Sequence, residues 1–193
     1  MEQSDLDALL ADARARRPAA IDRLYRLFSP RVYGFLMRLL PSRDVADDLL
    51  QETFLRVVRT IETYVHDGRF EAWIFRIAAN LARDHMRQRR RRGFVARLDE
   101  IDADDGTVRD TTADPHARSA LDVLISGEQA QRLEREFAAL PEMDREILAL
   151  RHHAELSFRE IAELLGVPLG TALARAHRAL GRLRGAVRNA DGE

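Results

Sequence analysis

Apolar side chains recur at intervals of three and four residues along most of this chain, and this spacing is the strongest constraint on its fold. It is clearest over residues 44–61, where the apolar positions fall on one face of a helix. Those positions are Val45, Leu49, Leu50, Phe54, Val57, Val58 and Ile61. The strict alternation typical of a half-buried strand occurs nowhere, and the sequence therefore predicts an all-α protein.

Helix start and stop signals divide the chain into separate helices. Pro18 suits the first turn of one helix, and Ser42 or Asp44 begins the next. A further helix is predicted from about residue 70 to residue 92. Ser157 and Glu160 have the spacing of a capping box, and Gly166 ends the helix that this box begins.

Charge is segregated along the chain, although the formal net charge is only -1. Residues 83–97 carry seven arginines and one acid, whereas residues 99–114 carry seven acids and one arginine. Residues 168–190 carry five arginines and no acid. Blocks of this kind predict two sites for a polyanion, separated by an acidic segment that is too polar to form a packed core.

The predicted architecture is two small helical domains joined by a flexible linker. An N-terminal helical bundle covers residues 1–92, the acidic linker covers 93–127, a C-terminal helix-turn-helix domain covers 128–188, and 189–193 form a tail. The alternative for the acidic segment is a long surface loop inside one domain, but loops of that length are uncommon.

Several classes of protein and site are not expected from this sequence. It has no cysteine, which excludes disulfides and thiolate metal sites, and no apolar run approaches the ~20 residues that span a bilayer. The first ten residues are acidic where a signal peptide would be basic, which predicts a soluble, cytoplasmic protein. Asp47 and Asp48 diverge by about 100° on a helix, and His152 and His153 lack a third ligand at metal spacing. We therefore expect no metal and no cofactor. No glycine-rich phosphate loop, nucleophile elbow or catalytic triad occurs in the sequence, and we expect no small-molecule substrate.

The last predicted helix carries a basic outer face. Residues 157–184 have the layout of a helix-turn-helix, whose second helix enters the major groove of DNA. The residues expected on the groove side are Thr171, Leu173, Arg175, His177 and Arg178. The open alternative is an amphipathic hairpin whose basic face is only solvated.

Two other helices carry candidate binding faces. Arg76, Asn80, Arg83 and Arg87 follow four-three-four spacing beside an aromatic core face, and such side chains pair with base edges and phosphates. We interpret Trp73 as a core residue rather than a platform for a base. The helix over 44–61 presents a self-repelling acidic face, which suits a basic protein partner. An ordinary solvated face remains equally compatible with the spacing. The residues of this face are Asp47, Asp48, Gln51, Glu52 and Arg56.

Three stretches together resemble bacterial extracytoplasmic-function sigma factors, a group of the sigma-70 family. They are "DVADDLLQETFLRVVR", "FEAWIFRIAANLARDHMRQRRRR" and "LPEMDREILALRHHAELSFREIAELLGVPLGTALARAHRALGRLR", and they are similar to conserved regions two and four. The resemblance implies a non-enzymatic subunit that binds core RNA polymerase and promoter DNA, and that is held inactive by an anti-sigma factor in many relatives. A membrane-bound anti-sigma factor would tether it to the membrane.

The resemblance also assigns expected roles to residues. The acidic face named above would dock on a coiled coil of the largest polymerase subunit. The C-terminal domain would bind the -35 element, through the groove-side residues listed above, and the polymerase flap. The positions expected to bind the melted -10 strand are His66, Arg69, Phe70, Arg76, Asn80, Arg83 and Arg87.

One stretch departs from the family pattern. The family's last helix usually contains "GTVKSRLHRA", whereas this chain has "GTALARAHRA". Leu173 and Ala174 replace two polar groups that face the groove, and a leucine cannot form a bidentate hydrogen bond with a base. Ala172 and Ala176 replace larger core residues, and each buried methylene lost is worth ~0.8 kcal/mol. We expect a weak or atypical -35 contact in which Arg175 and Arg178 hold phosphate.

Two other functions are compatible with the residues alone. One is a stand-alone helix-turn-helix regulator whose N-terminal bundle dimerises or senses a signal. The other is a nucleic-acid-processing enzyme that uses the carboxylates at 47, 48 and 52.

Overall fold

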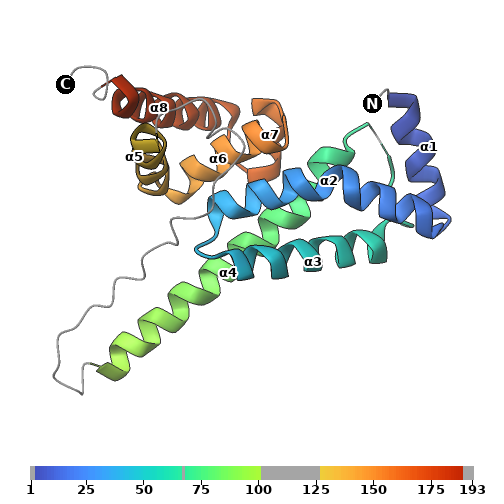
Figure 1. The fold of residues 1–193 in the computed structure, drawn as a ribbon, viewed down its shortest axis with the longest axis horizontal. Coiled ribbons are helices and arrows are strands. Elements are labelled where there is room, and N and C mark those ends of the chain that lie inside the picture. Colours follow the sequence, from blue (N-terminus) through green and yellow to red (C-terminus); the bar gives the residue numbers. More distant parts are fainter. Residues whose placement is uncertain (1–2, 67, 101–126, 189–193) are drawn as a thin grey trace.

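The protein is helical throughout the part of the chain that the structure describes. The structure is a computed structural model that describes residues 3–66, 68–100 and 127–188, which form eight α-helices without any strand among them (Figure 1). The helices are α1 (Gln3–Arg14), α2 (Pro18–Leu39), α3 (Arg43–Thr60), α4 (Phe70–Glu100), α5 (Gly127–Ala138), α6 (Glu142–His153), α7 (Phe158–Leu165) and α8 (Leu169–Arg188). The predicted all-α fold class is confirmed.

The predicted capping residues begin and end the helices as expected. The Ser42 side chain caps α3 and accepts a hydrogen bond from the Val45 backbone N–H at 3.4 Å. Ser157 and Glu160 form the predicted capping box, in which each side chain binds the other residue's backbone N–H. Gly166 follows α7 in the left-handed conformation, with φ of 67°, which glycine adopts without steric cost.

Helix α4 extends beyond its predicted end. The prediction ended this helix at residue 92 and began the linker at 93, but α4 continues to Glu100. Arginine, alanine and leucine favour the helix in this stretch, and the one glycine costs only ~1 kcal/mol. The rest of the predicted linker, residues 101–126, and the predicted tail lie outside the described residues.

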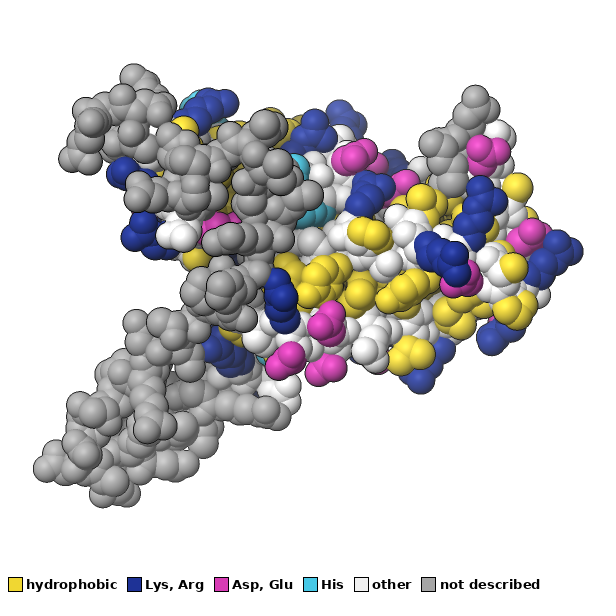
Figure 2. Space-filling view, viewed as in Figure 1, with side chains coloured by type: hydrophobic (Ala, Val, Ile, Leu, Met, Phe, Trp, Pro, Cys, Tyr) yellow, Lys and Arg dark blue, Asp and Glu magenta, His cyan; other side chains and the backbone are white. Residues whose placement is uncertain are grey.

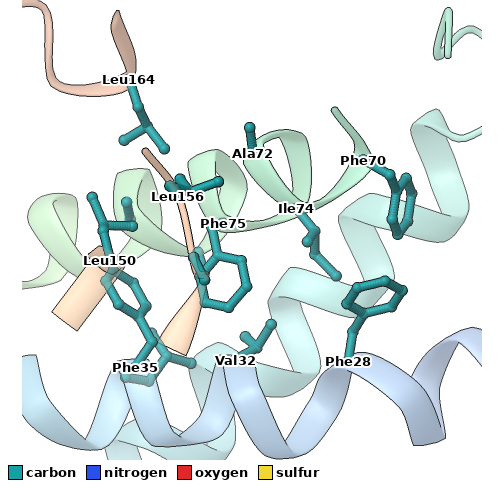
Figure 3. Close-up of a cluster of buried hydrophobic side chains, with 14 of the residues drawn as sticks. Phe28, Val32, Phe35, Phe70, Ala72, Ile74, Phe75, Leu150, Leu156 and Leu164 are labelled. Carbon is teal, nitrogen blue, oxygen red and sulfur yellow. The ribbon is translucent and has the colours of Figure 1, made fainter. Parts of the chain in front are cut away.

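The core of the N-terminal bundle is built on α2, which packs against α1, α3 and α4. Aromatic rings from α2 and α4 meet edge to face: Phe28 lies 5.1 Å from Phe70 and Phe35 lies 5.5 Å from Phe75, measured between ring centroids (Figure 3). Such pairs contribute about 0.5–1.5 kcal/mol of stability beyond the free energy gained by burying their surface. Helices α2 and α4 are thereby fixed side by side.

The hydrophobic core does not stop at the boundary between the two predicted domains. Helix α6 packs along α2, and α7 contacts α4. Leu150 of α6 lies beside Phe35 and Phe75 in Figure 3, and Leu156 and Leu164 approach α4 from the same side. Each buried leucine contributes roughly 1.5–3 kcal/mol. The N-terminal bundle and the C-terminal helices therefore share one continuous core.

Within the C-terminal unit, α8 packs on α5, α6 and α7 through its alanines. Ala172, Ala176 and Ala179 are fully or almost fully buried, and their small side chains let α8 approach the other helices closely. Leu180, the next apolar residue along the helix, is exposed. The reason is that the three alanines, and not the leucine, define the buried side of the helix.

Gly34 marks the closest approach of α2 to α6. A Cβ atom at this position would lie 2.7 Å from Cε1 and Nδ1 of His153. We expect Gly34→Val to lower the thermal unfolding midpoint and to raise the radius of gyration in small-angle X-ray scattering, because His153 and with it α6 must move away. Gly34→Ala should do the same more weakly, despite a gain of ~1 kcal/mol in helix propensity.

The matched control is Gly170→Ala in α8, where nothing lies within 4 Å of the added atom. This variant should be neutral or stabilised by up to about 1 kcal/mol. If Gly34→Val unfolds and scatters X-rays like the unmodified protein, the close approach of α2 and α6 is not as described.

Candidate nucleic-acid interface

The acidic face predicted on α3 is open to solvent. Asp47, Asp48 and Gln51 are exposed, and Glu52 forms an ion pair with Arg56 one turn later, at 2.8 Å. Leu55 is 50% exposed beside them. Figure 2 shows hydrophobic side chains gathered along the face that carries α2 and α3, with acidic side chains next to them. The predicted residues therefore form one accessible surface of mixed acidic and apolar character.

The polar stripe predicted on α4 lies on one side of the helix, but its members differ in accessibility. Arg76 and Asn80 are exposed. Arg87 is exposed and lies 3.5 Å from Asp84 in the preceding turn. Arg83 is half-buried, and its Nε lies 3.1 Å from Oε1 of Glu146 on α6. A residue of the C-terminal unit thus covers one arginine of the stripe.

The loop before α4 places its predicted DNA-binding residues differently. Phe70 is fully buried against Phe28 and is a core residue in this structure, because as the first residue of α4 it closes the end of the bundle. Its contact with DNA stays a prediction. Arg69 forms an ion pair with Glu163 of α7 at 2.9 Å, and His66 is held at both ring nitrogens.

The groove-side residues of α8 are largely accessible. Leu173 is 44% exposed, and His177 and Arg178 are exposed as well, whereas Thr171 is half-buried. Arg175 differs from the others, because its Nη1 donates to Oδ1 of Asp144 on α6 at 2.9 Å. Its guanidinium therefore ties α8 to α6 in this structure.

Helix α6 carries three carboxylates that each meet an arginine of another helix, and no local pattern in the sequence indicates these pairs. Glu142 forms an ion pair with Arg90, Asp144 with Arg175, and Glu146 with Arg83. Arg83 and Arg90 belong to α4, and Arg175 belongs to α8. One turn and a half of α6 therefore contacts both helices on which the sequence places nucleic-acid contacts.

The pair between Glu146 and Arg83 is buried and imperfect. The Glu146 side chain is only 4% exposed, and burial raises the pKa of its carboxyl, while Arg83 acts in the opposite direction. The two atoms are within ion-pair distance, but the Arg83 N–H is not aimed at the oxygen, so that neither atom has a hydrogen bond. Buried pairs of this kind recover little of their desolvation cost. Arg83 can therefore exchange Glu146 for a partner that accepts a better hydrogen bond.

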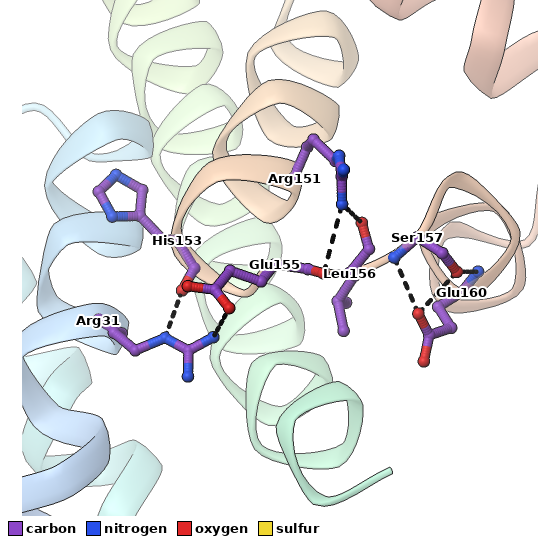
Figure 4. A network of polar contacts seen from close by, with 7 residues as sticks. All are labelled: Arg31, Arg151, His153, Glu155, Leu156, Ser157 and Glu160. Carbon is purple, nitrogen blue, oxygen red and sulfur yellow. Dashed lines mark hydrogen bonds and ion pairs between the residues drawn. The ribbon is translucent and has the colours of Figure 1, made fainter. Parts of the chain in front are cut away.

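His153 lies at the centre of the contact between α2 and α6. The Arg31 side chain donates through Nε to the His153 carbonyl oxygen at 2.8 Å and approaches Glu155 at 3.9 Å (Figure 4). Burial lowers the pKa of the His153 imidazole to about 4, and the positive charges of His152, Arg38 and Arg31 add to this shift. The imidazole is therefore neutral when α2 and α6 are packed.

A cavity of about 840 Å³ lies beside this contact, between α5, α6 and α8. Its apolar lining includes Phe137, Leu148, Leu180 and Leu183, and Arg38 of α2 lies at its edge. The exposure of Leu180 noted above is exposure to this cavity.

Comparison with known proteins gives the family. Residues 24–92 match the model of Sigma-70 region 2, and residues 137–185 match that of Sigma-70, region 4. The RNA polymerase sigma factor CarQ of Myxococcus xanthus is 34% identical over 165 residues, which cover 86% of this chain and 87% of that protein. The ECF RNA polymerase sigma factor SigW of Bacillus subtilis is 27% identical over 163 residues, 84% of this chain and 86% of that protein. The chain belongs to the extracytoplasmic-function group of the sigma-70 family.

Solved structures agree with the fold of this sigma factor. The sigma factor RpoE of Bartonella quintana, solved with the anti-sigma factor NepR, has a TM-score of 0.65 at 23% identity, over 86% of this chain and 96% of that one. CnrH, solved with the cytosolic domain of CnrY, also has a TM-score of 0.65, at 22% identity, over 95% and 97%.

Family membership decides between the functions that the residues alone left open. A sigma factor is a transcription initiation factor and not an enzyme, which excludes a nuclease built on the α3 carboxylates and a stand-alone regulator. Within the described ranges, no three metal-ligating side chains form a cluster. No helix among those described is long and apolar enough to cross a membrane.

We expect the packing of α2 against α6 to weaken in acid. The pKa of His153 is lowered from 6.5 to about 4 in the folded protein, so its contribution to stability is complete above about pH 6.5 and is lost as the pH falls through about 4. The unfolding midpoint, followed by circular dichroism across this range, should fall less steeply in His153→Gln than in the unmodified protein.

His152→Gln is the matched control, because His152 is the exposed neighbour on the same turn. It should keep most of the steep dependence, because burial, and not the charge of His152, is the largest cause of the lowered His153 pKa. A pH profile of His153→Gln that superimposes on that of the unmodified protein would show that carboxylates alone account for the loss in acid.

Proposed function

We propose that this sigma factor attaches to core RNA polymerase through the exposed acidic face of α3, and that attachment frees the arginines of the α4 and α8 DNA-binding faces that α6 carboxylates hold beforehand. Residues 1–92 act as the unit for polymerase and the -10 element, and residues 128–188 as the unit for the -35 element. The family binds core polymerase and promoter DNA, and the face formed by Asp47, Asp48, Gln51, Glu52 and Arg56 is accessible in the packed form. The polymerase can therefore dock before the two units separate.

The observation that carries this proposal is the position of the α6 carboxylates. Glu142 and Glu146 hold Arg90 and Arg83 of α4, and Glu163 of α7 holds Arg69. Each acid occupies the place of a DNA phosphate next to an arginine, because carboxylate and phosphate oxygens offer the same kind of acceptor to a guanidinium. The free factor therefore has part of its -10 surface occupied by its own chain.

The relative strengths of the contacts explain why this cover can be removed. Exposed ion pairs contribute about 0–1 kcal/mol each, and the buried pair between Arg83 and Glu146 lacks a good hydrogen bond. The apolar contact between α2 and α6 holds the units together more strongly than these pairs do. Polymerase need only supply more binding free energy on the open form than that contact provides.

The -35 contact is weaker than in most relatives under this proposal. Leu173 and Ala174 offer no hydrogen bond to a base, and Arg175 is engaged with Asp144. The exposed arginine nearest to the start of α8 is then Arg178, with His177 beside it. Such residues hold phosphate more readily than they select a base. The cavity beside α5 and α8 is the apolar surface to which the polymerase flap would bind.

An anti-sigma factor is the second proposed partner. The sigma factor RpoE of Bartonella quintana was solved with the anti-sigma factor NepR, and CnrH was solved with the cytosolic domain of CnrY. A partner that binds across α2 and α6 would hold the covered form and keep the factor from promoters. The protein would then act in the cytoplasm, at the nucleoid when active, and at the membrane where its inhibitor is membrane-bound.

Removal of the two α6 carboxylates that hold arginines of α4 should let the free factor bind DNA. We expect the double variant Glu142→Gln, Glu146→Gln to bind a fork-junction fragment with an unpaired -10 strand about tenfold more tightly than the unmodified factor, a gain of ~1.4 kcal/mol. The reason is that Arg83 and Arg90 lose their internal partners. Fluorescence anisotropy without polymerase measures the change.

The control is the double variant Asp12→Asn, Asp22→Asn, which changes the net charge equally and also releases two arginines, Arg17 and Arg26, on the far end of the bundle. An equal gain in both double variants would mean that net charge, and not the cover, sets the affinity.

Reversal of charge on α3 should abolish attachment to polymerase. The double variant Asp48→Arg, Glu52→Arg should bind core enzyme at least about 100-fold more weakly, because two charges would then repel the basic partner surface. Asp22→Arg, on the exposed side of α2, should have little effect. Pull-down with purified core polymerase measures both, and wild-type attachment of the double variant would refute the assigned surface.

A further inference from the structure

Helix α1 contacts the loop that precedes α4. This helix lies before residue 24, where the match to the family models begins. Asp7 Oδ1 lies 2.8 Å from Nε2 of His66. The Arg14 side chain donates to the Tyr64 carbonyl oxygen at 2.6 Å, and Arg16 forms an ion pair with Glu62. Two residues of α1 and one residue just after its end thus contact residues 62–66.

The contact between Asp7 and His66 fixes the orientation of the imidazole. A carboxylate can only accept a hydrogen bond, so Nε2 of His66 carries the proton. Nδ1 lies 3.1 Å from the Tyr64 hydroxyl, which donates to it when the ring is neutral. Both ring nitrogens are therefore used inside the protein, and the His66 side chain is only 13% exposed. His66 is thereby suited to hold the loop and not to pair with a base.

Tyr64 connects His66 to the beginning of α4. Its ring stacks on Trp73, with centroids 4.5 Å apart and planes inclined by 29°, and meets the edge of Phe70 at 5.7 Å. Trp73 lies one turn before Arg76, the first residue of the polar stripe. A chain of direct contacts therefore runs from Asp7 through His66 and Tyr64 to the start of the predicted DNA-binding face.

We propose that Asp7 is a positioning residue for recognition of the unpaired -10 strand. Through His66 and Tyr64 it fixes the position of these two residues against the start of α4, so that the stripe of α4 meets the bases in a fixed geometry. This inference rests on the proposed function, in which that loop and stripe bind the -10 strand. It assigns α1, which lies outside the matched region, a part in recognition of the -10 strand. It also gives His66 a structural role in place of a contact with a base.

The stability of α1 itself does not depend on Asp7. The helix is docked by Leu6, Leu9, Leu10 and Ala13, all of them buried, whereas the Asp7 side chain is 53% exposed. Removal of its carboxylate should leave α1 in place and release only the loop. The expected effect is a loss of selectivity between bases. A loop with several conformations offers no single geometry that favours the preferred base over the others.

The experiment uses the full-length factor with core polymerase and a fork-junction DNA whose unpaired strand is randomised over the -10 bases. Sequencing of the bound fraction gives the enrichment of the preferred bases over the others. We expect Asp7→Ala to lower this enrichment about fivefold, the effect of one lost hydrogen bond. The affinity for core polymerase should stay unchanged.

Two further variants separate positioning from general stability. Asp7→Asn keeps an oxygen that accepts from Nε2–H and should restore most of the enrichment. Tyr64→Phe keeps the stack on Trp73 but removes the hydroxyl, and it should lower the enrichment as Asp7→Ala does. Asp5→Ala, an exposed acid on the same helix, should match the unmodified factor.

Equal enrichment in Asp7→Ala and Asp5→Ala would overturn the inference, and so would a uniform loss of binding to all sequences at unchanged enrichment. Asn80→Ala and Arg76→Ala are tested alongside as a check on the proposed function. If they lower the enrichment while Asp7→Ala does not, only the role of Asp7 fails. If neither they nor Asp7→Ala alter it, the assignment of the -10 surface itself fails.

Discussion

The packing of α6 against α2 is the interaction on which the rest of this structure depends. It joins the N-terminal bundle and the C-terminal helices into one hydrophobic core, with Leu150 beside Phe35 and Phe75, and it requires the absence of a side chain at Gly34. Because α6 is held there, its carboxylates reach the arginines of α4. The ion pairs follow from this packing, since apolar burial contributes more free energy than exposed charge pairs do.

This arrangement separates two kinds of surface. The acidic face of α3 is open, whereas two arginines of α4 and Arg69 of the preceding loop meet acids of α6 and α7. The order of events proposed for this sigma factor follows from that difference: the accessible surface attaches first, and the covered surfaces become available afterwards. These arginines thus bind acids of the same molecule before they bind DNA.

Much of the fold and part of the site could be predicted from the sequence. The all-α class, the caps at Ser42 and Ser157 and the left-handed Gly166 depend on residues near one another in the chain, and local spacing reports such features. Phe70 shows what this approach missed: its place beside the -10 stripe suggested a contact with DNA, whereas in this structure its side chain is part of the core. An aromatic residue at the start of a helix has the same local pattern in both situations.

The sequence by itself determined which helices form, which of their faces are charged, and to which family the chain belongs, because periodicity, capping and motif spacing are properties of short stretches. Only the tertiary structure decided that Glu142 and Glu146 meet Arg90 and Arg83, and that Asp7 meets His66. These partners are far apart in the chain. Their meeting depends on how helices pack in three dimensions, which no local pattern encodes.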